Sequence, residues 1–386
     1  MSDSAKKSTT SKNSTFAPTS TAFSDSNNMT ELKVSLSERS YPIHIGNGAF
    51  GLALENFSQI VRNGGKIACV ADESLLSLFP QSAEKLKSLG IHMFPVHGGE
   101  PSKSFEMLEK LCESFAAAGL DRKSTVAAWG GGVIGDLAGF AAATYMRGIA
   151  LVQIPTTLLS MVDSSVGGKT GINIRAGKNL VGAFHQPGAV YIDTSFLSTL
   201  PMREFSAGMA EVIKCGALGD AELFSALEKT QEPLSHDSKY LPEAIRRSCA
   251  LKAKIVSEDE RETSKEGGRA LLNFGHTLGH AVEKCAGYGV FVHGEAVAIG
   301  MAFAAKLSVA QSTLSEIDAN RLVKLIQKFG LPTSVPDRIK TADLIESMRH
   351  DKKSVGGSLR FVLLDGIGAS YTKTLEEADV LKALES

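Results

Sequence analysis

The sequence lacks paired cysteines, long apolar runs and an excess of basic residues. No run of about 18 uninterrupted apolar residues occurs, so we expect no transmembrane helix. The formal net charge of -1 argues against nucleic acid or a membrane surface as a partner, because both attract a basic excess. The cysteines form no C-x-x-C pair, which is typical of reduced thiols in a cytoplasmic protein. They are Cys69, Cys112, Cys215, Cys249 and Cys285.

Large apolar side chains are also almost absent from residues 1–30, where Ser, Thr, Asn and Lys predominate. Such a segment cannot bury enough surface to offset its loss of conformational entropy, so we expect a disordered tail. A transit peptide is the alternative, but the segment contains no Arg and carries Asp3 and Asp25, which argues against it.

Strand-like and helix-like segments alternate between residues 31 and 200. Apolar runs at 66–71, 124–129 and 150–155 predict strands, and an amphipathic stretch at 104–118 predicts a helix. Strands that alternate with helices favour a mainly parallel sheet. We therefore expect residues 31–200 to form an N-terminal α/β domain.

Beyond residue 201 the spacing of apolar residues becomes helical. A pair of short β-like runs, 358–364 and 369–372, follows near the end of the chain. We therefore expect residues 201–386 to form a mostly α-helical second domain, with the functional site in the cleft between the domains. The helix-like segments are 203–218, 221–228, 242–257, 270–285, 295–311 and 316–329.

A glycine-rich turn follows the expected strand at 124–129. Residues 130–135 satisfy G-x-G-x-x-G, the pattern with which a strand–turn–helix unit binds the pyrophosphate of a dinucleotide. A structural tight turn explains these glycines equally well. No acidic residue closes the next strand, as the usual fingerprint requires. Asp72, which follows the strand at 66–71, is the better candidate for binding a ribose hydroxyl.

Residues 163–170 imitate a Walker A loop, but Asp163 stands where that motif needs glycine. A P-loop NTPase is therefore not expected. A glycine loop that delivers Lys169 to an anion is still consistent with the sequence.

Three of the nine histidines, His276, His280 and His293, lie close together in the sequence. His276 and His280 are four residues apart on one helical face, and Glu211 and Lys214 are three apart on another. Clustered histidines with an inward-facing carboxylate favour a metal site over isolated core or surface histidines. Two histidines and a carboxylate would leave a coordination position open, as in catalytic zinc sites.

A set of basic residues lies beside the glycine loops or in segments that carry candidate ligands. Solvated surface explains most basic residues, but a phosphorylated or carboxylated substrate would explain these positions. They are Arg147, Lys169, Lys178, Lys214, Lys252, Arg269, Lys352 and Lys353.

Longer motifs occur at residues 145–148 (YMRG), 155–159 (PTTLL), 163–170 (DSSVGGKT), 177–179 (GKN), 210–214 (AEVIK), 259–262 (DERE), 273–280 (NFGHTLGH) and 293–297 (HGEAV). In their order and spacing they resemble the 3-dehydroquinate synthase family of sugar-phosphate cyclases. The resemblance implies conversion of 3-deoxy-D-arabino-heptulosonate 7-phosphate to 3-dehydroquinate and phosphate. The steps would be oxidation by NAD, phosphate elimination, reduction and intramolecular aldol closure, with NAD regenerated in each turnover.

The resemblance also implies roles for individual residues. Zinc, with Co²⁺ as an alternative ion, would be held by Glu211, His276 and His293, and proton transfer would involve His280 and Glu262. The substrate would be contacted by Asp163, Lys169, Asn179, Lys214, Lys252, Arg269, Asn273, His280, Arg147 and Lys353 or its neighbour Lys352. NAD would lie along Asp72, Glu100, Lys103, Gly131, Gly132, Val133, Asp136, Thr156, Thr157, Lys178, Phe196 and Thr199. The protein would be a homodimer in which Arg147 reaches the substrate phosphate of the neighbouring subunit.

Three positions depart from the family pattern. Ser74 stands where Asn is common, and one extra residue separates His280 from His293. The segment after Glu262 is longer than usual, so Glu262 and Glu266 both fit the acidic position.

Three alternatives differ in the function they imply. A related cyclase with another substrate would use the same motifs. A metal- and NAD-dependent polyol dehydrogenase would not need the phosphate-binding cations. A non-catalytic NAD-sensing module would not need a complete set of catalytic groups.

Overall fold

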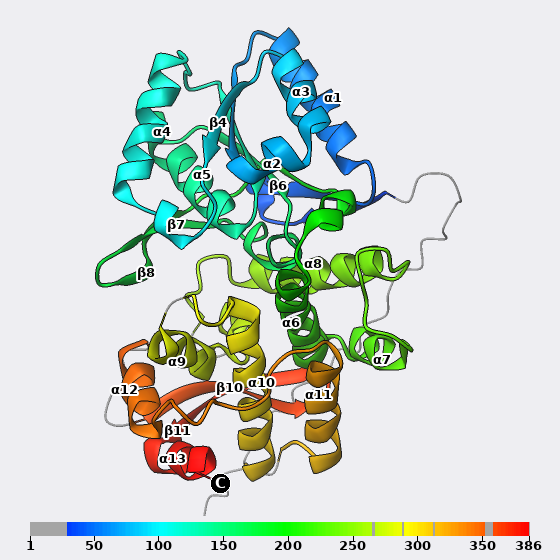
Figure 1. Ribbon diagram of the computed structural model, residues 1–386, viewed down its shortest axis with the longest axis vertical. Helices are drawn as coiled ribbons and strands as arrows, with labels where there is room; N and C mark the ends of the chain where they lie inside the picture. The colour runs from blue at the N-terminus through cyan, green and yellow to red at the C-terminus, as the bar shows by residue number, and fades with distance from the viewer. Residues whose placement is uncertain (1–28, 265–266, 288, 312, 352–357, 386) are drawn as a thin grey trace, which may run out of the picture.

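The structure, a computed structural model, describes residues 29–264, 267–287, 289–311, 313–351 and 358–385. Most of the expected tail, together with Glu266, Lys352 and Lys353, lies outside the described residues. A sheet with its helices occupies one half of the molecule and a mostly helical group the other, with α6 (Met202–Gly219) and α8 (Leu241–Glu258) between them (Figure 1). Among the described residues, no helix is long and apolar enough to cross a membrane.

The central sheet has seven strands in the order β1-β2-β9-β6-β5-β3-β4. β1 pairs antiparallel with β2, and the other neighbouring strands pair in parallel. The prediction of a mainly parallel sheet is thus confirmed. The strands are β1 (Thr30–Val34), β2 (Tyr41–Ile45), β3 (Ile67–Asp72), β4 (His92–Val96), β5 (Thr125–Gly130), β6 (Ala150–Pro155) and β9 (Ala189–Ile192).

Helices cover both faces of this sheet because successive residues of a strand point to opposite sides. Ala68 and Val70 of β3 belong to one buried cluster with Phe115 of α4. Cys69, between them in sequence, belongs to another with Phe57 of α1. The helices of this half are α1 (Ala49–Arg62), α2 (Glu73–Leu78), α3 (Pro80–Ser88), α4 (Phe105–Ala117) and α5 (Gly132–Thr144).

The strand order reverses at β3, since β4 lies on one side of it and β5 on the other. In parallel sheets, ligands bind outside the carboxyl ends of the strands at such a reversal. Asp72 ends β3 and Gly130 ends β5, so the predicted ribose-binding residue and the glycine turn lie at the same crevice.

An antiparallel hairpin, β7 (Lys169–Ile174) and β8 (Gly177–Phe184), forms a separate sheet. The glycine loop expected at 163–170 is shorter than predicted. Asp163 lies in a single π-helical turn, η4 (Ser160–Ser164), and Lys169 already begins β7. Gly167 and Gly168, both with positive φ, make the turn between them.

The second half is mostly helical, as predicted, and ends with the expected hairpin and a further helix. The single helix predicted at 270–285 is wrong, because Gly275 has φ of +81° and interrupts it. A 3₁₀ turn, η6 (Gly268–Asn273), precedes the break. The other elements are α7 (Ala221–Lys229), α9 (His276–Ala286), α10 (His293–Ala310), α11 (Glu316–Lys328), α12 (Thr341–Asp351), β10 (Ser358–Gly366), β11 (Ala369–Glu376) and α13 (Glu377–Glu385).

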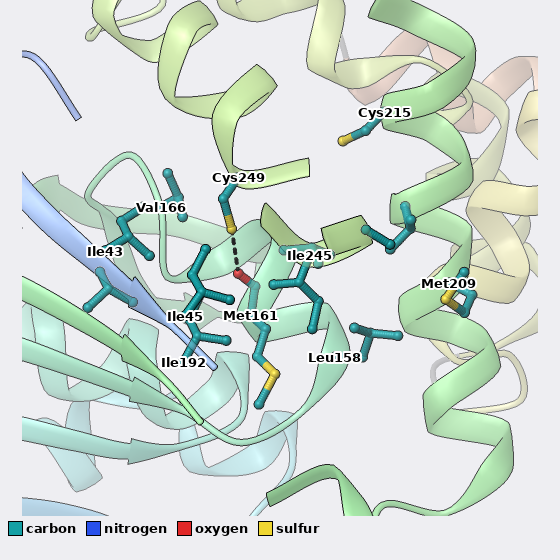
Figure 2. Close-up of a cluster of buried hydrophobic side chains, with 14 of the residues drawn as sticks. Ile43, Ile45, Leu158, Met161, Val166, Ile192, Met209, Cys215, Ile245 and Cys249 are labelled. Carbon is teal, nitrogen blue, oxygen red and sulfur yellow. Dashed lines mark hydrogen bonds between the residues drawn. The ribbon is translucent and has the colours of Figure 1, made fainter. Parts of the chain in front are cut away.

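A continuous hydrophobic cluster joins the two halves. Figure 2 shows Ile45 of β2 and Ile192 of β9 near Met161 of η4, with Cys249 of α8 above them. The Cys249 thiol donates a hydrogen bond to the carbonyl oxygen of Met161 over 3.3 Å. The turn that carries Asp163 is therefore packed against both the sheet and the helical half.

Candidate active site

Glu211, His276 and His293 converge from three helices. The Oε1 atom of Glu211 on α6 lies 3.8 Å from Nε2 of His276 and 3.7 Å from Nε2 of His293. Glu211 is 1% exposed, and its Oε1 has no hydrogen-bond partner among the described residues. A buried carboxylate oxygen that faces two imidazole nitrogens is what a metal ion would satisfy.

Each of the two histidines is oriented by its other ring nitrogen. Nδ1 of His276 donates to the carbonyl oxygen of Phe274 over 3.1 Å, and Nδ1 of His293 donates to Oε2 of Glu283 over 3.3 Å. With the proton on Nδ1, Nε2 is the nitrogen of each ring that remains to bind a metal. Burial and the charge of Lys214 hold the pKa of His276 well below its usual value, which favours the neutral ring that ligation requires.

Close backbone packing brings the three helices together. A Cβ atom on Gly294 would lie 2.0 Å from the carbonyl oxygen of Ala207 on α6. A Cβ on Gly300 would lie 1.8 Å from the carbonyl oxygen of Gly275, just before α9. Only glycine fits at these two positions of α10, and it sets the spacing of the three ligands.

Lys214 forms a fully buried ion pair with Oε2 of Glu211, one helical turn away. Burial alone would lower the pKa of Lys214, but the attraction of Glu211 and Asp163 outweighs it, and the pKa lies above its usual value. The predicted helical face shared by Glu211 and Lys214 is therefore present, with the ammonium group beside the metal ligands.

Asp163 and Lys252 form a second ion pair next to this cluster. Nζ of Lys252 lies 2.5 Å from Oδ1 of Asp163 and 2.6 Å from its carbonyl oxygen. Burial would raise the pKa of Asp163, but Lys252 and Lys214 together hold it well below its usual range. Burial lowers the pKa of Lys252, and the attraction of Asp163 opposes this effect.

A third group surrounds the start of β7. Nζ of Lys169 lies 2.5 Å from Oε2 of Glu262, and Asn273 donates to Oε1 of Glu262 over 3.5 Å. Arg269 is 3% exposed, and its Nη1 donates to the carbonyl oxygen of Gly167 over 2.9 Å. Glu262 thus meets the predicted substrate-binding residues, whereas Glu266 lies outside the described residues.

Several of the residues predicted to bind NAD form two groups. Nζ of Lys103 lies 2.6 Å from Oδ2 of Asp136 and also donates a hydrogen bond to Oδ1 of Asn179. Nearby in sequence, Glu100 accepts a hydrogen bond from the side chain of Asn173. At the start of α5, a Cβ on Gly131 would lie 3.1 Å from Cγ2 of Thr157, which leaves a glycine-lined approach to the helix. Gly132 and Val133 begin α5, and Thr156 follows β6.

Asp72, at the end of β3, lines a cavity of about 440 Å³ together with Ser74 and His97. Oδ1 of Asp72 accepts hydrogen bonds from the backbone and hydroxyl of Ser74, at 3.0 and 2.7 Å. The serine that departs from the family pattern therefore orients the carboxylate. This volume lies within the usual range of small-molecule pockets.

Some predicted residues do not join these clusters. Phe196 is buried in an aromatic group with Phe50 and Trp129, at centroid distances of 5.4 and 5.9 Å, which is a core environment. Thr199 is exposed in a 3₁₀ turn, and Arg147 is exposed after α5. Among the described residues, no hydrogen bond or ion pair links Arg147 to the other predicted substrate residues of the same subunit.

His280 and Glu283 lie next to the proposed metal ligands. The His280 ring lies 5.4 Å from that of His276 between centroids, so it borders the site as predicted. Glu283 was not predicted: three residues after His280, it reads as an ordinary solvated carboxylate. Its spacing on the His276 and His280 face was the available signal.

A crevice at a parallel-sheet reversal, beside a two-histidine, one-carboxylate site ringed by lysines, defines a metal-dependent enzyme that also binds a nucleotide and an anionic substrate. The chain belongs to the 3-dehydroquinate synthase family. The family's N-terminal sequence model matches residues 93–207, and its C-terminal model matches residues 208–354.

Individual relatives agree with this assignment. The chain is 45% identical to a 3-dehydroquinate synthase of Desulforamulus reducens, over 92% of this chain and 99% of that protein. A structure of 2-deoxy-scyllo-inosose synthase with carbaglucose-6-phosphate, NAD⁺ and Co²⁺ matches with a TM-score of 0.82 and 28% identity, over 92% and 99% of the two chains. A 2-epi-5-epi-valiolone synthase of Streptomyces hygroscopicus with NAD⁺ and Zn²⁺ matches with a TM-score of 0.75 and 29% identity, over 83% and 89%.

Proposed function

We propose that the protein is a 3-dehydroquinate synthase, which converts 3-deoxy-D-arabino-heptulosonate 7-phosphate to 3-dehydroquinate and phosphate with NAD and a divalent metal such as Zn²⁺. The convergence of Glu211, His276 and His293 beside Lys214 and Lys252 carries the proposal. When bound, the metal would polarise a substrate hydroxyl, and the nicotinamide would take up a hydride and return it.

The buried ammonium groups orient the substrate beside the metal site. The ammonium groups of Lys214 and Lys252 each have N–H bonds to offer beyond the carboxylate partner. Hydroxyl and carboxylate groups of a sugar acid would accept these bonds. Asp163, held as an anion by the two lysines, would accept a hydrogen bond from a substrate hydroxyl.

Lys169, Asn273 and Arg269 suit the phosphate. A phosphate monoester carries close to two negative charges at neutral pH and needs charged donors when it leaves water. Lys169 forms an ion pair with Glu262, and the substrate phosphate would replace the Glu262 carboxylate as the partner of Lys169. Glu262 Oε2 would then be released to accept a proton close to the leaving group, and His280 lies on the metal side for a second transfer.

A related cyclase with another substrate is the second candidate, because the two solved cyclases share the fold. Sequence identity favours a 3-dehydroquinate synthase, because the chain is 45% identical to the relative of that name and only 28% and 29% identical to the two solved cyclases. The test is phosphate release from the heptulosonate phosphate with catalytic NAD⁺ and Zn²⁺. Release from a different sugar phosphate alone would support the other cyclase, and stoichiometric NADH accumulation would support a dehydrogenase.

The finer assignments also belong to this proposal. A homodimer would bring Arg147 of one subunit to the phosphate site of the other, and the exposed apolar residues Leu180 and Phe184 of β8 suit a protein contact. Mixed Arg147→Ala and Lys169→Ala subunits should regain part of the activity if the site is shared. The unpaired thiols of the five cysteines support a cytoplasmic location.

A further inference from the structure

Glu283 is a mostly buried carboxylate outside the proposed ligand set, and its two oxygens have different partners. Its side chain is 12% exposed. Oε2 accepts a hydrogen bond from Nδ1 of His293 over 3.3 Å, and Oε1 lies 3.6 Å from Nζ of Lys178. The carboxylate therefore bridges a ring nitrogen and an ammonium group.

These three residues come from separate parts of the chain. Glu283 is on α9, His293 begins α10, and Lys178 is on β8 of the hairpin attached to the sheet half. Figure 1 shows this hairpin extending from the sheet half on the side where α9 lies. The contact thus links the half that carries the nucleotide crevice to the half that carries the metal ligands.

The arrangement fixes the ring of His293. A terminal carboxylate torsion is broad and roughly two-fold, so one hydrogen bond leaves it free to swing. An ammonium group on the opposite oxygen removes that freedom. A fixed carboxylate then holds the proton on Nδ1 and directs Nε2 toward Glu211, 3.7 Å away.

We propose that Glu283 and Lys178 are positioning residues for the metal: Glu283 orients the ligand His293, and Lys178 holds Glu283 in place. The inference rests on the proposed metal site. It extends that site into a chain of contacts that crosses from one half of the molecule to the other.

Direct ligation by Glu283 is the competing explanation. Glu283, His280 and His293 also form a group whose donor atoms lie within 4.8 Å of one another. A metal bound by that group would use Nδ1 of His293. The site with Glu211 and His276 would use Nε2 of His293, because this nitrogen faces the Glu211 oxygen that also faces His276. One ion cannot use both nitrogens of His293, so the two explanations separate experimentally.

The experiment measures zinc affinity of the full chain by competition with a chromophoric chelator. Glu283→Gln should weaken zinc binding about 10- to 100-fold, the usual effect of losing an outer partner of a ligand. Lys178→Met should also weaken it, by up to about tenfold. Electrostatics alone predicts the opposite sign, because removing a cation near a dication should tighten binding. Tighter zinc binding by Lys178→Met would overturn the role of the lysine.

The double variant tests whether the two residues act as one unit. Lys178→Met should not weaken zinc binding further when Glu283→Gln is already present. An additive loss would show that Lys178 does not act through Glu283. Glu228→Gln is the matched control, since it removes a half-buried carboxylate paired with Arg321 on α11 and should leave zinc affinity unchanged.

Cobalt absorption distinguishes orientation from ligation. Saturated with Co²⁺, Glu283→Gln should keep the wild-type ligand-field spectrum, because the ligands are unchanged. A changed spectrum, with His280→Ala losing metal as strongly, would identify Glu283 as a ligand and refute the inference. If Glu211→Gln and His276→Ala retain zinc, the proposed metal site itself fails. If they lose zinc and Glu283→Gln binds it normally, only this inference fails.

Discussion

Replacing Lys214 by methionine removes the cation from a fully buried ion pair. Glu211 and Lys214 are each 1% exposed, and the other oxygen of Glu211 already has no hydrogen-bond partner among the described residues. The substitution leaves the carboxylate buried without a compensating charge. Breaking a buried pair in this way costs about 3–5 kcal/mol.

We expect this loss in the metal-free protein. At roughly 2–4 °C per kcal/mol for a domain of about 200 residues, the melting temperature should fall by roughly 6–20 °C. Added Zn²⁺ should recover part of the difference, because a metal ion would supply a positive charge next to Glu211. The double variant Glu211→Gln/Lys214→Met should be more stable than Lys214→Met alone, since it contains no unpaired buried charge.

The assay is urea unfolding followed by circular dichroism, with chelator and then with Zn²⁺. Lys110→Met is the matched control, because Lys110 forms an exposed pair with Glu106 and should change stability by less than about 0.5 kcal/mol. An unfolding midpoint for Lys214→Met equal to that of wild type in chelator would refute the reasoning. A loss that Zn²⁺ leaves unchanged would show that the metal does not bind beside Glu211.

Three further predictions concern acid stability, helix packing and thiol reactivity. Because the pKa of Asp163 is depressed well below its usual range, its ion pair stabilises the fold fully above the unfolded value near 4 and loses this effect as pH falls toward the folded value. The stability gap between wild type and Asp163→Asn should therefore narrow mainly below about pH 4, and an equal gap in urea at pH 7 and pH 2.5 would contradict this. Gly300→Ala should cost at least about 1–3 kcal/mol of unfolding free energy and weaken zinc binding, because its Cβ would meet the carbonyl oxygen of Gly275. The control is Gly51→Ala in α1, which should be neutral or stabilising because nothing lies within 4 Å of its Cβ. Equal unfolding curves for the two variants would count against close packing at Gly300. Burial raises the pKa of Cys69, Cys215 and Cys249 to about 12. A thiol reagent should therefore modify only Cys112 and Cys285 rapidly in the native protein, and all five cysteines in denaturant. Rapid labelling of Cys249 in the native protein would contradict its buried position.

The sequence allowed the alternating half of the fold and a metal site with clustered histidines to be predicted because both leave short-range patterns, whereas the choice of Glu211, His276 and His293 as ligands came from the family resemblance. Buried parallel strands have continuous apolar runs, such as residues 66–71, and the helical spacing of His276 and His280 puts two imidazoles on one face. The hairpin β7–β8 was not predicted, since its glycines and charged residues give no clear alternation. The break at Gly275 was missed because apolar spacing continues across it, although a positive φ ends the helix.

Tertiary contacts explain the other omissions. Glu283 looks like a surface residue until α10 brings His293 to it, and no sequence spacing between them indicates this. Phe196 could be assigned only by resemblance, and the structure places it among core aromatics. The pairing of Lys169 with Glu262 joins positions far apart in sequence and needed the folded chain to be seen.

The glycine contacts of α10 have a consequence for changing the metal preference of this protein. Gly294 and Gly300 meet carbonyl oxygens of neighbouring segments, so the distance between the helices is already at its lower limit. Main-chain atoms have no alternative rotamers, so a Cβ at either position would push the helices apart. A protein engineer who wants a smaller or larger ion at the site should therefore vary the side chains that orient the ligands and leave both glycines untouched.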